Sequence, residues 1–229
     1  MRRPARPLRL REGTILDLAG RGLALVLGLV LSATAAIAAE APSGTFLYGI
    51  HHEEYGDIGA HKVSFSRSGE DLMVEVENRI SVKVLFITAY RFEADRVEIW
   101  RDGRLISYKS ETYDDGDDYG VFAEAKGGKL MIDAGHGRVE APGDVVPTHP
   151  WNMALTERSL LMDTKTGALL EVTVAEAGEE TIEAGGEQVE ARKFVISGDL
   201  EREVWYGPGD RWLQMRFDKD GAEITFTLQ

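Results

Sequence analysis

Residues 71–78 read DLMVEVEN, and apolar side chains alternate with polar ones through most of this stretch. Successive side chains of an extended chain point to opposite faces, so alternation with period two is typical of a strand with one buried and one solvated face. The apolar face carries Leu72, Val74 and Val76, and the polar face carries Glu75 and Glu77.

The same pattern continues outward to both sides of this stretch, up to residues 222–228 (AEITFTL). Asp-Gly and Gly-Gly pairs recur between the alternating segments, and tight hairpins favour them because their central residues need positive φ. We therefore expect an all-β protein with a single antiparallel, strongly curved sheet or an incomplete β-barrel. The turn signals lie at Asp102-Gly103, Asp115-Gly116, Gly127-Gly128, Gly185-Gly186 and Asp220-Gly221.

One stretch breaks the alternation, residues 135–163 (GHGRVEAPGDVVPTHPWNMALTERSLLMD). Pro142, Pro147 and Pro150 exclude a regular central strand because proline cannot donate to the ladder. The stretch predicts a long loop followed by a short helix or irregular turn over residues 153–159. Long loops in compact domains are often functional lids, and a simple crossover between two halves of the sheet is the alternative.

The first 38 residues are expected to be a secretory signal peptide. Six arginines lie within the first 21 residues, the apolar run LALVLGLVL covers residues 23–31, and Ala-Ile-Ala follows at residues 36–38. This order of segments is typical of a cleaved leader, and the apolar run is shorter than the roughly 20 residues that span a bilayer. We expect cleavage near Ala38 and a single β-rich domain over residues 39–229 in the periplasm.

Composition narrows the classes of partner. The chain has no cysteine, which excludes disulfides and a lipid-modified cysteine, so the protein is not expected to be a lipoprotein. Cleavage of the expected signal peptide removes six arginines together with Glu12 and Asp17, and this changes the formal net charge from −13 to −17. Such an acidic surface repels nucleic acid and anionic lipid head groups. The outward strand positions are charged, which argues against a membrane-embedded barrel.

Residues 48–65 (YGIHHEEYGDIGAHKVSF) hold three of the five histidines. A type II′ turn at Gly56-Asp57 would close a hairpin here. That register places the apolar residues of both strands on one face, as a buried face requires. Its cross-strand pairs are Tyr48 with Phe65, Ile50 with Val63, and His52 with His61.

In this register His52, His61 and Glu54 converge at the hairpin end of the core face. Two histidines and a carboxylate suit zinc or non-haem iron, so these residues are candidates for the rim of a ligand cavity and, more weakly, for a metal site. The alternative is an ordinary polar hairpin end. His51 and Glu53 are expected to face water.

Residues 148–152 (THPWN) add His149 and Trp151 as candidate ligand-binding residues beside the long loop. Tryptophan closes cavities but more commonly anchors loops. Trp212 is out of phase with Leu213, Met215 and Phe217, so partial exposure is expected. The sequence has no G-x-S-x-G, P-loop, dinucleotide or H-E-x-x-H motif, and it predicts no catalytic residue and no cofactor.

Five motifs together resemble a family of secreted proteobacterial proteins known only as a domain of unknown function, over nearly the whole expected mature chain. The strand content is also similar, more distantly, to that of periplasmic carriers of lipids and lipoproteins. The resemblance implies a curved, incompletely closed barrel and no assigned activity. The motifs are YGDIGAHKVSF (55–65), YRFEADRVEIWRDGRLISYKSET (90–112), HPWN (149–152), DTKTGALLEVTV (163–174) and VWYGPGDRWLQMRF (204–217).

We therefore expect a periplasmic protein that binds a lipid, another apolar or amphipathic small molecule, or an envelope partner, without catalysis. The first alternative is a metal-dependent or hydrolase-like enzyme that uses His52, His61 and Glu54. The second is a structural or assembly factor whose edge strands accept another protein.

Overall fold

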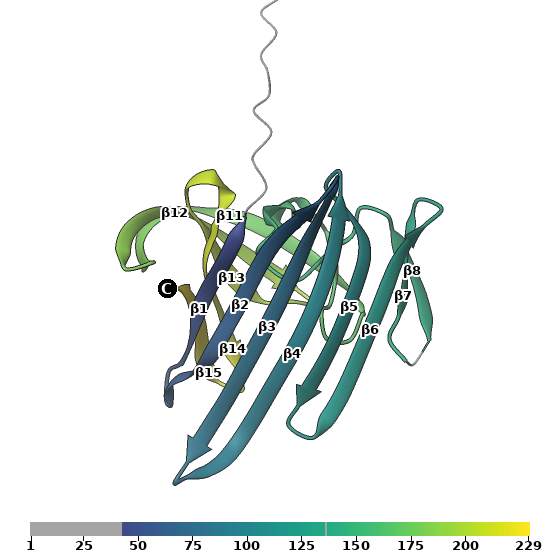
Figure 1. Cartoon of the computed structure of the whole chain (residues 1–229). Coiled ribbons are helices and arrows are strands. Elements are labelled where there is room, and N and C mark those ends of the chain that lie inside the picture. The colour runs from purple at the N-terminus through teal and green to yellow at the C-terminus, as the bar shows by residue number, and fades with distance from the viewer. Residues whose placement is uncertain (1–42, 136) are drawn as a thin grey trace, which may run out of the picture. The chain divides into compact units, whose positions relative to one another are not determined.

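The computed structural model describes residues 43–135 and 137–229, which form fifteen strands and two short 3-10 helices (Figure 1). The predicted signal peptide lies outside the described residues. The first eight strands are β1 (Gly44–His52), β2 (Gly56–Ser68), β3 (Asp71–Val84), β4 (Ile87–Arg101), β5 (Arg104–Asp114), β6 (Asp117–Lys126), β7 (Lys129–Asp133) and β8 (Arg138–Pro142). The rest are β9 (Val146–Pro147), η1 (Met153–Glu157), β10 (Leu160–Met162), β11 (Leu169–Ala184), β12 (Glu187–Gly198), β13 (Arg202–Tyr206), η2 (Pro208–Asp210), β14 (Trp212–Lys219) and β15 (Ala222–Leu228).

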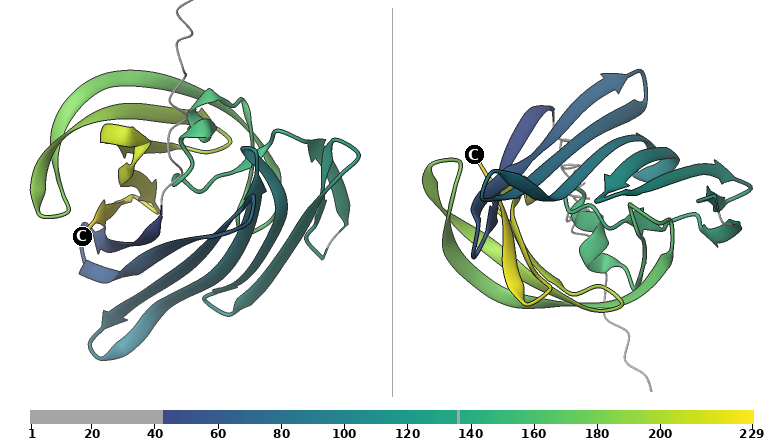
Figure 2. Two further views of the ribbon diagram at one scale, coloured as in Figure 1. Left: turned by 45° about the horizontal axis from the view of Figure 1, so that its top comes forward. Right: turned by 90° about the horizontal axis from the view of Figure 1, so that it is seen from below.

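All fifteen strands belong to one sheet, in the order β8-β7-β6-β5-β4-β3-β2-β1-β15-β14-β13-β12-β11-β10-β9. Strand β1 pairs with both β2 and β15, so the first and last strands meet in the middle of the sheet. The sheet curls without closing, and β8 and β9 are its two edges (Figure 2). The predicted all-β, curved and unclosed fold is confirmed. There are two differences. The pair β9 and β10 is parallel, and the stretch 135–163, which was expected to be a long loop with a short helix or turn, contains the short strands β8, β9 and β10.

The alternation in the sequence becomes the two faces of the sheet. In β3, the side chains of Leu72, Val74 and Val76 are buried, and those of Glu75 and Glu77 are exposed. The predicted turns occur as well, for example Asp102 and Gly103 between β4 and β5, both with positive φ. Local sequence chemistry therefore sets the strands and most of the hairpins.

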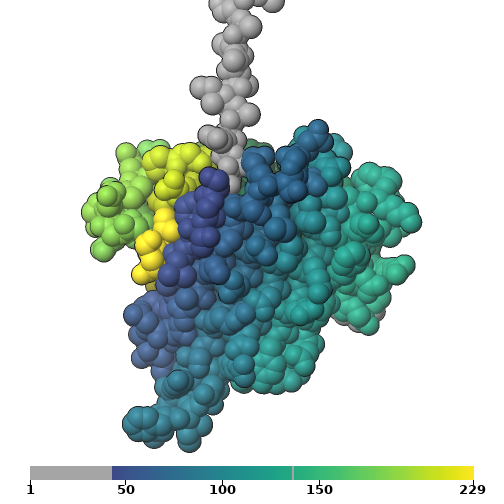
Figure 3. Space-filling view, viewed as in Figure 1, coloured from purple at the N-terminus to yellow at the C-terminus, as the bar shows by residue number. Residues whose placement is uncertain are grey.

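The turn between β3 and β4 follows no such rule. Leu85 and Phe86 occupy it with positive φ (49° and 69°), a conformation that bulky side chains rarely adopt. Both side chains are exposed, by 85% and 103%, and Ile87 beside them by 71%. Figure 3 shows this end of the hairpin projecting from the body of the molecule. We call residues 84–87 the apolar tip.

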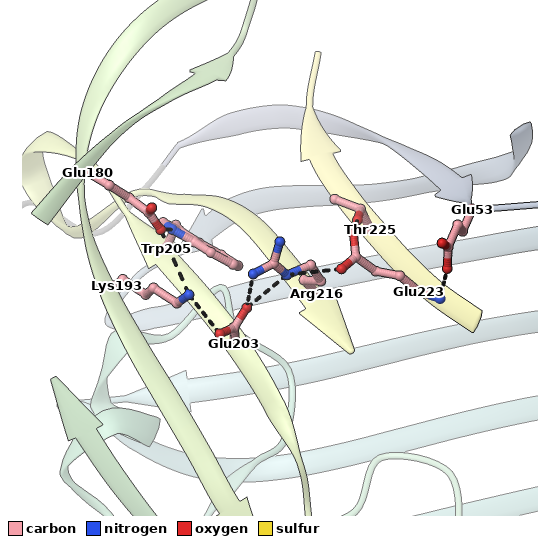
Figure 4. Close-up of polar contacts among 8 residues, drawn as sticks. All are labelled: Glu53, Glu180, Lys193, Glu203, Trp205, Arg216, Glu223 and Thr225. Atoms are coloured by element: carbon pink, nitrogen blue, oxygen red, sulfur yellow. Dashed lines mark hydrogen bonds and ion pairs between the residues drawn. The ribbon is translucent and has the colours of Figure 1, made fainter. Parts of the chain in front are cut away.

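The long β11–β12 hairpin bends back so that its end reaches the last strand, where Gly185 N donates to Leu228 O (2.8 Å). Beneath it, on the outer face of the sheet, Trp205 of β13 donates its indole N–H to Glu180 of β11 (Figure 4). The charged ends of Lys193 and Arg216 lie 4.9 and 5.2 Å from the Trp205 ring. Trp205 is therefore a buried anchor for this hairpin and does not face the interior of the fold.

No helix in residues 43–135 or 137–229 is long and apolar enough to cross a membrane.

Candidate functional site

Residues 145–150 of the predicted long loop pass through the interior of the curved sheet. All six are buried. Hydrogen bonds to the backbone of this segment hold it there, since Thr148 N donates to Met162 O (2.9 Å) and the Tyr206 hydroxyl donates to Pro150 O (2.8 Å). The short helix η1 follows, as predicted. The loop is therefore an interior segment that divides the space inside the sheet, which the sequence did not indicate.

His149 of this segment meets His61 of β2 in the centre of the fold. Their Nε2 atoms are 2.8 Å apart, so one ring must donate and the other accept, and the two imidazoles are different tautomers. Burial, aided by the charge of Arg96, lowers the pKa of His61 to about 3. Burial also holds the pKa of His149 well below its ordinary value, with smaller contributions from His61, Arg96 and Arg202. The pair is neutral at pH 7.

The predicted register of the first hairpin is wrong. Tyr48 pairs with His61 instead of Phe65, a shift of four residues, and a bulge lies after Ile50. The turn falls at residues 53–55, so His52 pairs with Gly56 and not with His61. A shift by an even number keeps the same side chains on the inner face. The predicted and the observed register therefore both bring the apolar side chains of the two strands to one face, and this criterion could not distinguish them.

The structure separates the three residues expected to converge. His52 is half-buried at the end of β1, and its Nδ1 accepts a hydrogen bond from the backbone N–H of Glu54 (3.1 Å). The Glu54 side chain is exposed, whereas His61 lies in the centre of the fold. In the described part of the chain, no three histidine or acidic side chains are grouped to hold a metal ion.

Trp151 and Trp100 share a buried carboxyl group that the sequence did not point to. Their indole N–H groups donate to the same oxygen, Oε2 of Glu98, at 2.9 and 2.8 Å. Glu98 is fully buried, and its Oε1 has no hydrogen-bond partner among the residues described. Burial raises the pKa of Glu98 to about 7, although the two indoles and Arg96 lower it. Trp151 therefore anchors the interior segment.

Replacing Glu98 by Gln is expected to remove a pH-dependent loss of stability. A carboxyl whose pKa is higher in the folded than in the unfolded state binds its proton more tightly when folded. The free energy of unfolding therefore falls as the pH rises from the ordinary value of 4.5 to about 7, and is steady above that. The wild type should lose about 2–3 kcal/mol from this residue between pH 5 and pH 8.

Urea unfolding of wild type and Glu98→Gln at these two pH values measures the difference. Glu77→Gln, an exposed position on the neighbouring strand, is the control and should keep the wild-type pH dependence. Equal pH dependence of Glu98→Gln and wild type would show that Glu98 ionises normally.

The expectation that Trp212 is partly exposed is wrong, since only 2% of it is accessible. A register shift between β13 and β14 pairs Tyr206 with Trp212 but Trp205 with Gln214. The bulge leaves Leu213 without a direct partner, so Trp212 and Leu213 are both buried although they are adjacent in sequence. The Trp212 ring stacks on Tyr48, with centroids 3.9 Å apart.

A cavity of about 690 Å³ lies on one side of the interior segment. This is within the range of small-molecule sites, roughly 300–1,000 Å³. Of the candidate residues, His52, Glu54, His61 and His149 line it. Its wall also includes further apolar side chains and further polar ones. The apolar ones are Ile58, Ile80, Val82, Phe92, Phe217, Ile224 and Phe226, and the polar ones include Asn78, Arg96, Thr148, Thr164 and Arg202.

A second cavity, of about 840 Å³, is lined by Trp151 and not by either buried histidine. Trp212 lines both cavities. The five candidate residues are thus divided between two cavities, and Trp151 is the one that is set apart. We call the 690 Å³ cavity the histidine cavity.

Sequence reasoning missed Arg96, Glu98 and Arg202. In β4 the inward residues include Arg96 and Glu98, while Val97 and Ile99 are on the other face. The apolar residues of this stretch predict the opposite orientation. One residue in the sequence does indicate the observed orientation of β4. Trp100 lies on the same face as Glu98, and a side chain of this size is rarely left exposed.

The fold and its interior define a β-barrel-like protein with an open sheet and an internal cavity. The chain belongs to the family described as domain of unknown function DUF6134, whose model matches residues 49–229. This agrees with the resemblance found in the sequence.

A solved structure with a similar fold is the beta-barrel-like protein of domain of unknown function DUF1849 from Brucella abortus. It has 12% sequence identity and a TM-score of 0.58, over 81% of this chain and 95% of that one. LprF from Mycobacterium bovis aligns with a TM-score of 0.33 and 9% identity, over 82% of this chain and 85% of that one, which is too low to support an argument. No curated protein sequence matches this chain significantly.

Proposed function

We propose that the protein binds an amphipathic small molecule in the histidine cavity, in the periplasm and without catalysis. The observation that carries this proposal is the cavity itself, whose wall combines apolar side chains with a comparable number of polar and charged ones. In ligand sites apolar area supplies affinity and polar groups orient the ligand, so a wall of both kinds suits a molecule with an apolar and a polar part.

The position of the apolar tip supports the proposal. Val82 of β3, with Ala89 and Tyr90 of β4, lines the histidine cavity, and the apolar tip connects these two strands. Exposed apolar side chains of this kind mark contacts with other apolar surfaces. A ligand that leaves a lipid phase or an apolar partner would then enter the cavity without crossing water.

The geometry of the histidines disfavours the enzyme alternative. His61 and His149 are neutral and hydrogen-bonded to each other, and the Nδ1 atom of each is buried without a partner in the described chain. A general base needs a partner that orients it and access to the substrate. His52, which was expected to supply a second group with Glu54, is the last residue of β1, and Glu54 lies in the turn that follows.

Native mass spectrometry of protein recovered from the periplasm tests both parts of the proposal. The expected mass is that of residues 39–229 with a bound small molecule. The variant Ile80→Trp places a larger side chain on the cavity wall and should reduce the bound fraction by about tenfold. Ile99→Trp, on the outer face of β4, is the matched control.

Protein that is retained in the cytoplasm contradicts the location. Wild type without any bound molecule, or Ile80→Trp with the wild-type amount, contradicts the binding site.

A further inference from the structure

Two arginines line the histidine cavity without an ionic partner. The Nε atoms of Arg96 on β4 and Arg202 on β13 are enclosed and have no hydrogen-bond partner in residues 43–135 and 137–229. Neither arginine takes part in any of the ion pairs formed by the described residues. Arg202 is half-buried and donates hydrogen bonds to Thr148 O (3.3 Å) and Met215 Sδ (3.4 Å), and Arg96 is 7% exposed.

The acidic side chains that line the same cavity do not neutralise these arginines. Asp114 accepts hydrogen bonds from Lys165 Nζ and from the Tyr90 hydroxyl, both at 2.8 Å. Asp220 lies 3.4 Å from Lys219 Nζ, and the Glu54 side chain is exposed at the hairpin end.

Two acidic groups near the arginines do not line the cavity, and both are already engaged. Glu98 accepts two indole N–H groups, and its raised pKa of about 7 leaves it partly protonated at neutral pH. Asp163 attracts Arg202, but its Oδ1 accepts from the backbone of Lys165 and Thr166 (3.1 and 2.7 Å). Burial, with repulsion from Arg96, lowers the pKa of Arg202 to about 10. Arg202 is therefore still charged at pH 7.

Enclosed charge without a counter-ion is unfavourable in proteins, and guanidinium groups match carboxylate and phosphate oxygens. The rest of the wall indicates how such an anion would be attached. Arg96 is six residues along β4 from Tyr90, about 20 Å at 3.3 Å per residue. Between these two positions the inward side chains at the hairpin end are apolar, with Phe92 paired with Ile80 of β3.

We propose that the ligand is a long-chain acidic amphiphile whose carboxylate or phosphate head group contacts Arg96 and Arg202, while its hydrocarbon chain extends toward the apolar tip. This inference rests on the proposed function and specifies the ligand class of the same cavity. With a formal net charge of −13, the protein does not attract anions at long range. Recognition of the acid therefore depends on the two enclosed arginines.

Binding of two probes that differ only in charge tests the proposal. Purified wild type should bind hexadecanoate about 10- to 100-fold more tightly than hexadecanol, because hydrogen bonds to charged groups are the strong ones. Arg96→Gln and Arg202→Gln should each lose most of this preference while keeping the wild-type affinity for hexadecanol. Retained hexadecanol binding also shows that each variant is folded. Arg79→Gln, on the exposed face of β3, is the control and should bind as wild type.

The outcomes separate the two proposals. Equal affinity for both probes, or an unchanged preference in Arg96→Gln and Arg202→Gln, overturns the acidic head group and leaves an amphiphile site. Failure of wild type to bind either probe contradicts the proposed function itself. Hexadecyl phosphate identifies the head group, since tighter binding than hexadecanoate assigns a phosphate and weaker binding a carboxylate.

Discussion

Lowering the pH from 7 to 5 is expected to cost the Glu98→Gln variant about 2 kcal/mol of its free energy of unfolding through His61 alone, and more in total because His149 acts in the same direction. His61 and His149 are neutral in the folded protein, where the pKa of His61 is about 3 and that of His149 is well below 6.5. In the unfolded chain both regain their ordinary pKa and take up protons below 6.5.

The sign follows from the protons bound in each state. Between the folded and the unfolded pKa values the unfolded chain binds more protons, so stability rises with pH. The contribution of the pair is complete above pH 6.5 and is lost as the pH falls toward 3. Glu98 acts in the opposite direction over the same range because its folded pKa is raised. The wild type should therefore lose about 2 kcal/mol less than Glu98→Gln.

Urea unfolding at the two pH values measures the effect. Replacing both His61 and His149 by Gln in the Glu98→Gln background removes the titrating groups and should reduce the loss to under about 1 kcal/mol. NMR of the imidazole groups gives a second measurement, and neither ring should titrate between pH 7 and pH 5. A ring that titrates near 6.5 would show that the pair is not enclosed in solution.

The histidine pair also shows why the fold could be predicted and the site could not. Alternation and turn chemistry are local, so the strands and the turns at Asp102-Gly103 and Gly185-Gly186 follow from a few adjacent residues. The contact between His61 and His149 joins residues 88 positions apart in sequence. It requires the interior path of residues 145–150, and nothing in the local sequence specifies that path.

The register of the first hairpin could be predicted only in part. The matching of apolar faces distinguishes odd shifts from even ones, because side chains alternate with period two. It cannot distinguish shifts of zero and four residues, and the first hairpin differs from the expected register by four. Pairing distant in sequence also constrains β1, since its other edge pairs with β15, where Tyr48 lies opposite Leu228.

The orientation of β4 fails for a different reason. Arg96 and Glu98 face inward against the usual preference of charged residues for the surface, while Val97 and Ile99 lie on the outer face. Departures from local rules are expected where function or strain overrides them. In this strand Arg96 lines the histidine cavity, and Glu98 holds the two indoles of Trp100 and Trp151.

Replacing Trp212 by Ala is expected to lower the free energy of unfolding at pH 7 by about 3–5 kcal/mol, as large-to-small changes of buried aromatic residues do. Its ring stacks on Tyr48 and meets the edges of both His61 and His149, with centroids 5.6 Å from each. The change removes these contacts together and leaves an unfilled space. Partial exposure, as the sequence suggested, would instead predict a change within about 0.5 kcal/mol.

The matched variant Trp212→Phe separates packing from polar effects. Phenylalanine can keep the stack on Tyr48, and it removes an indole N–H that has no hydrogen-bond partner among the residues described. It should therefore lose less than half as much stability as Trp212→Ala in the same urea titration. A loss below about 1 kcal/mol for Trp212→Ala would contradict the buried position.

Because Trp212 lines both cavities, Trp212→Ala should also join them. The variant should then show a weaker preference for hexadecanoate over hexadecanol, since water would reach the enclosed arginines.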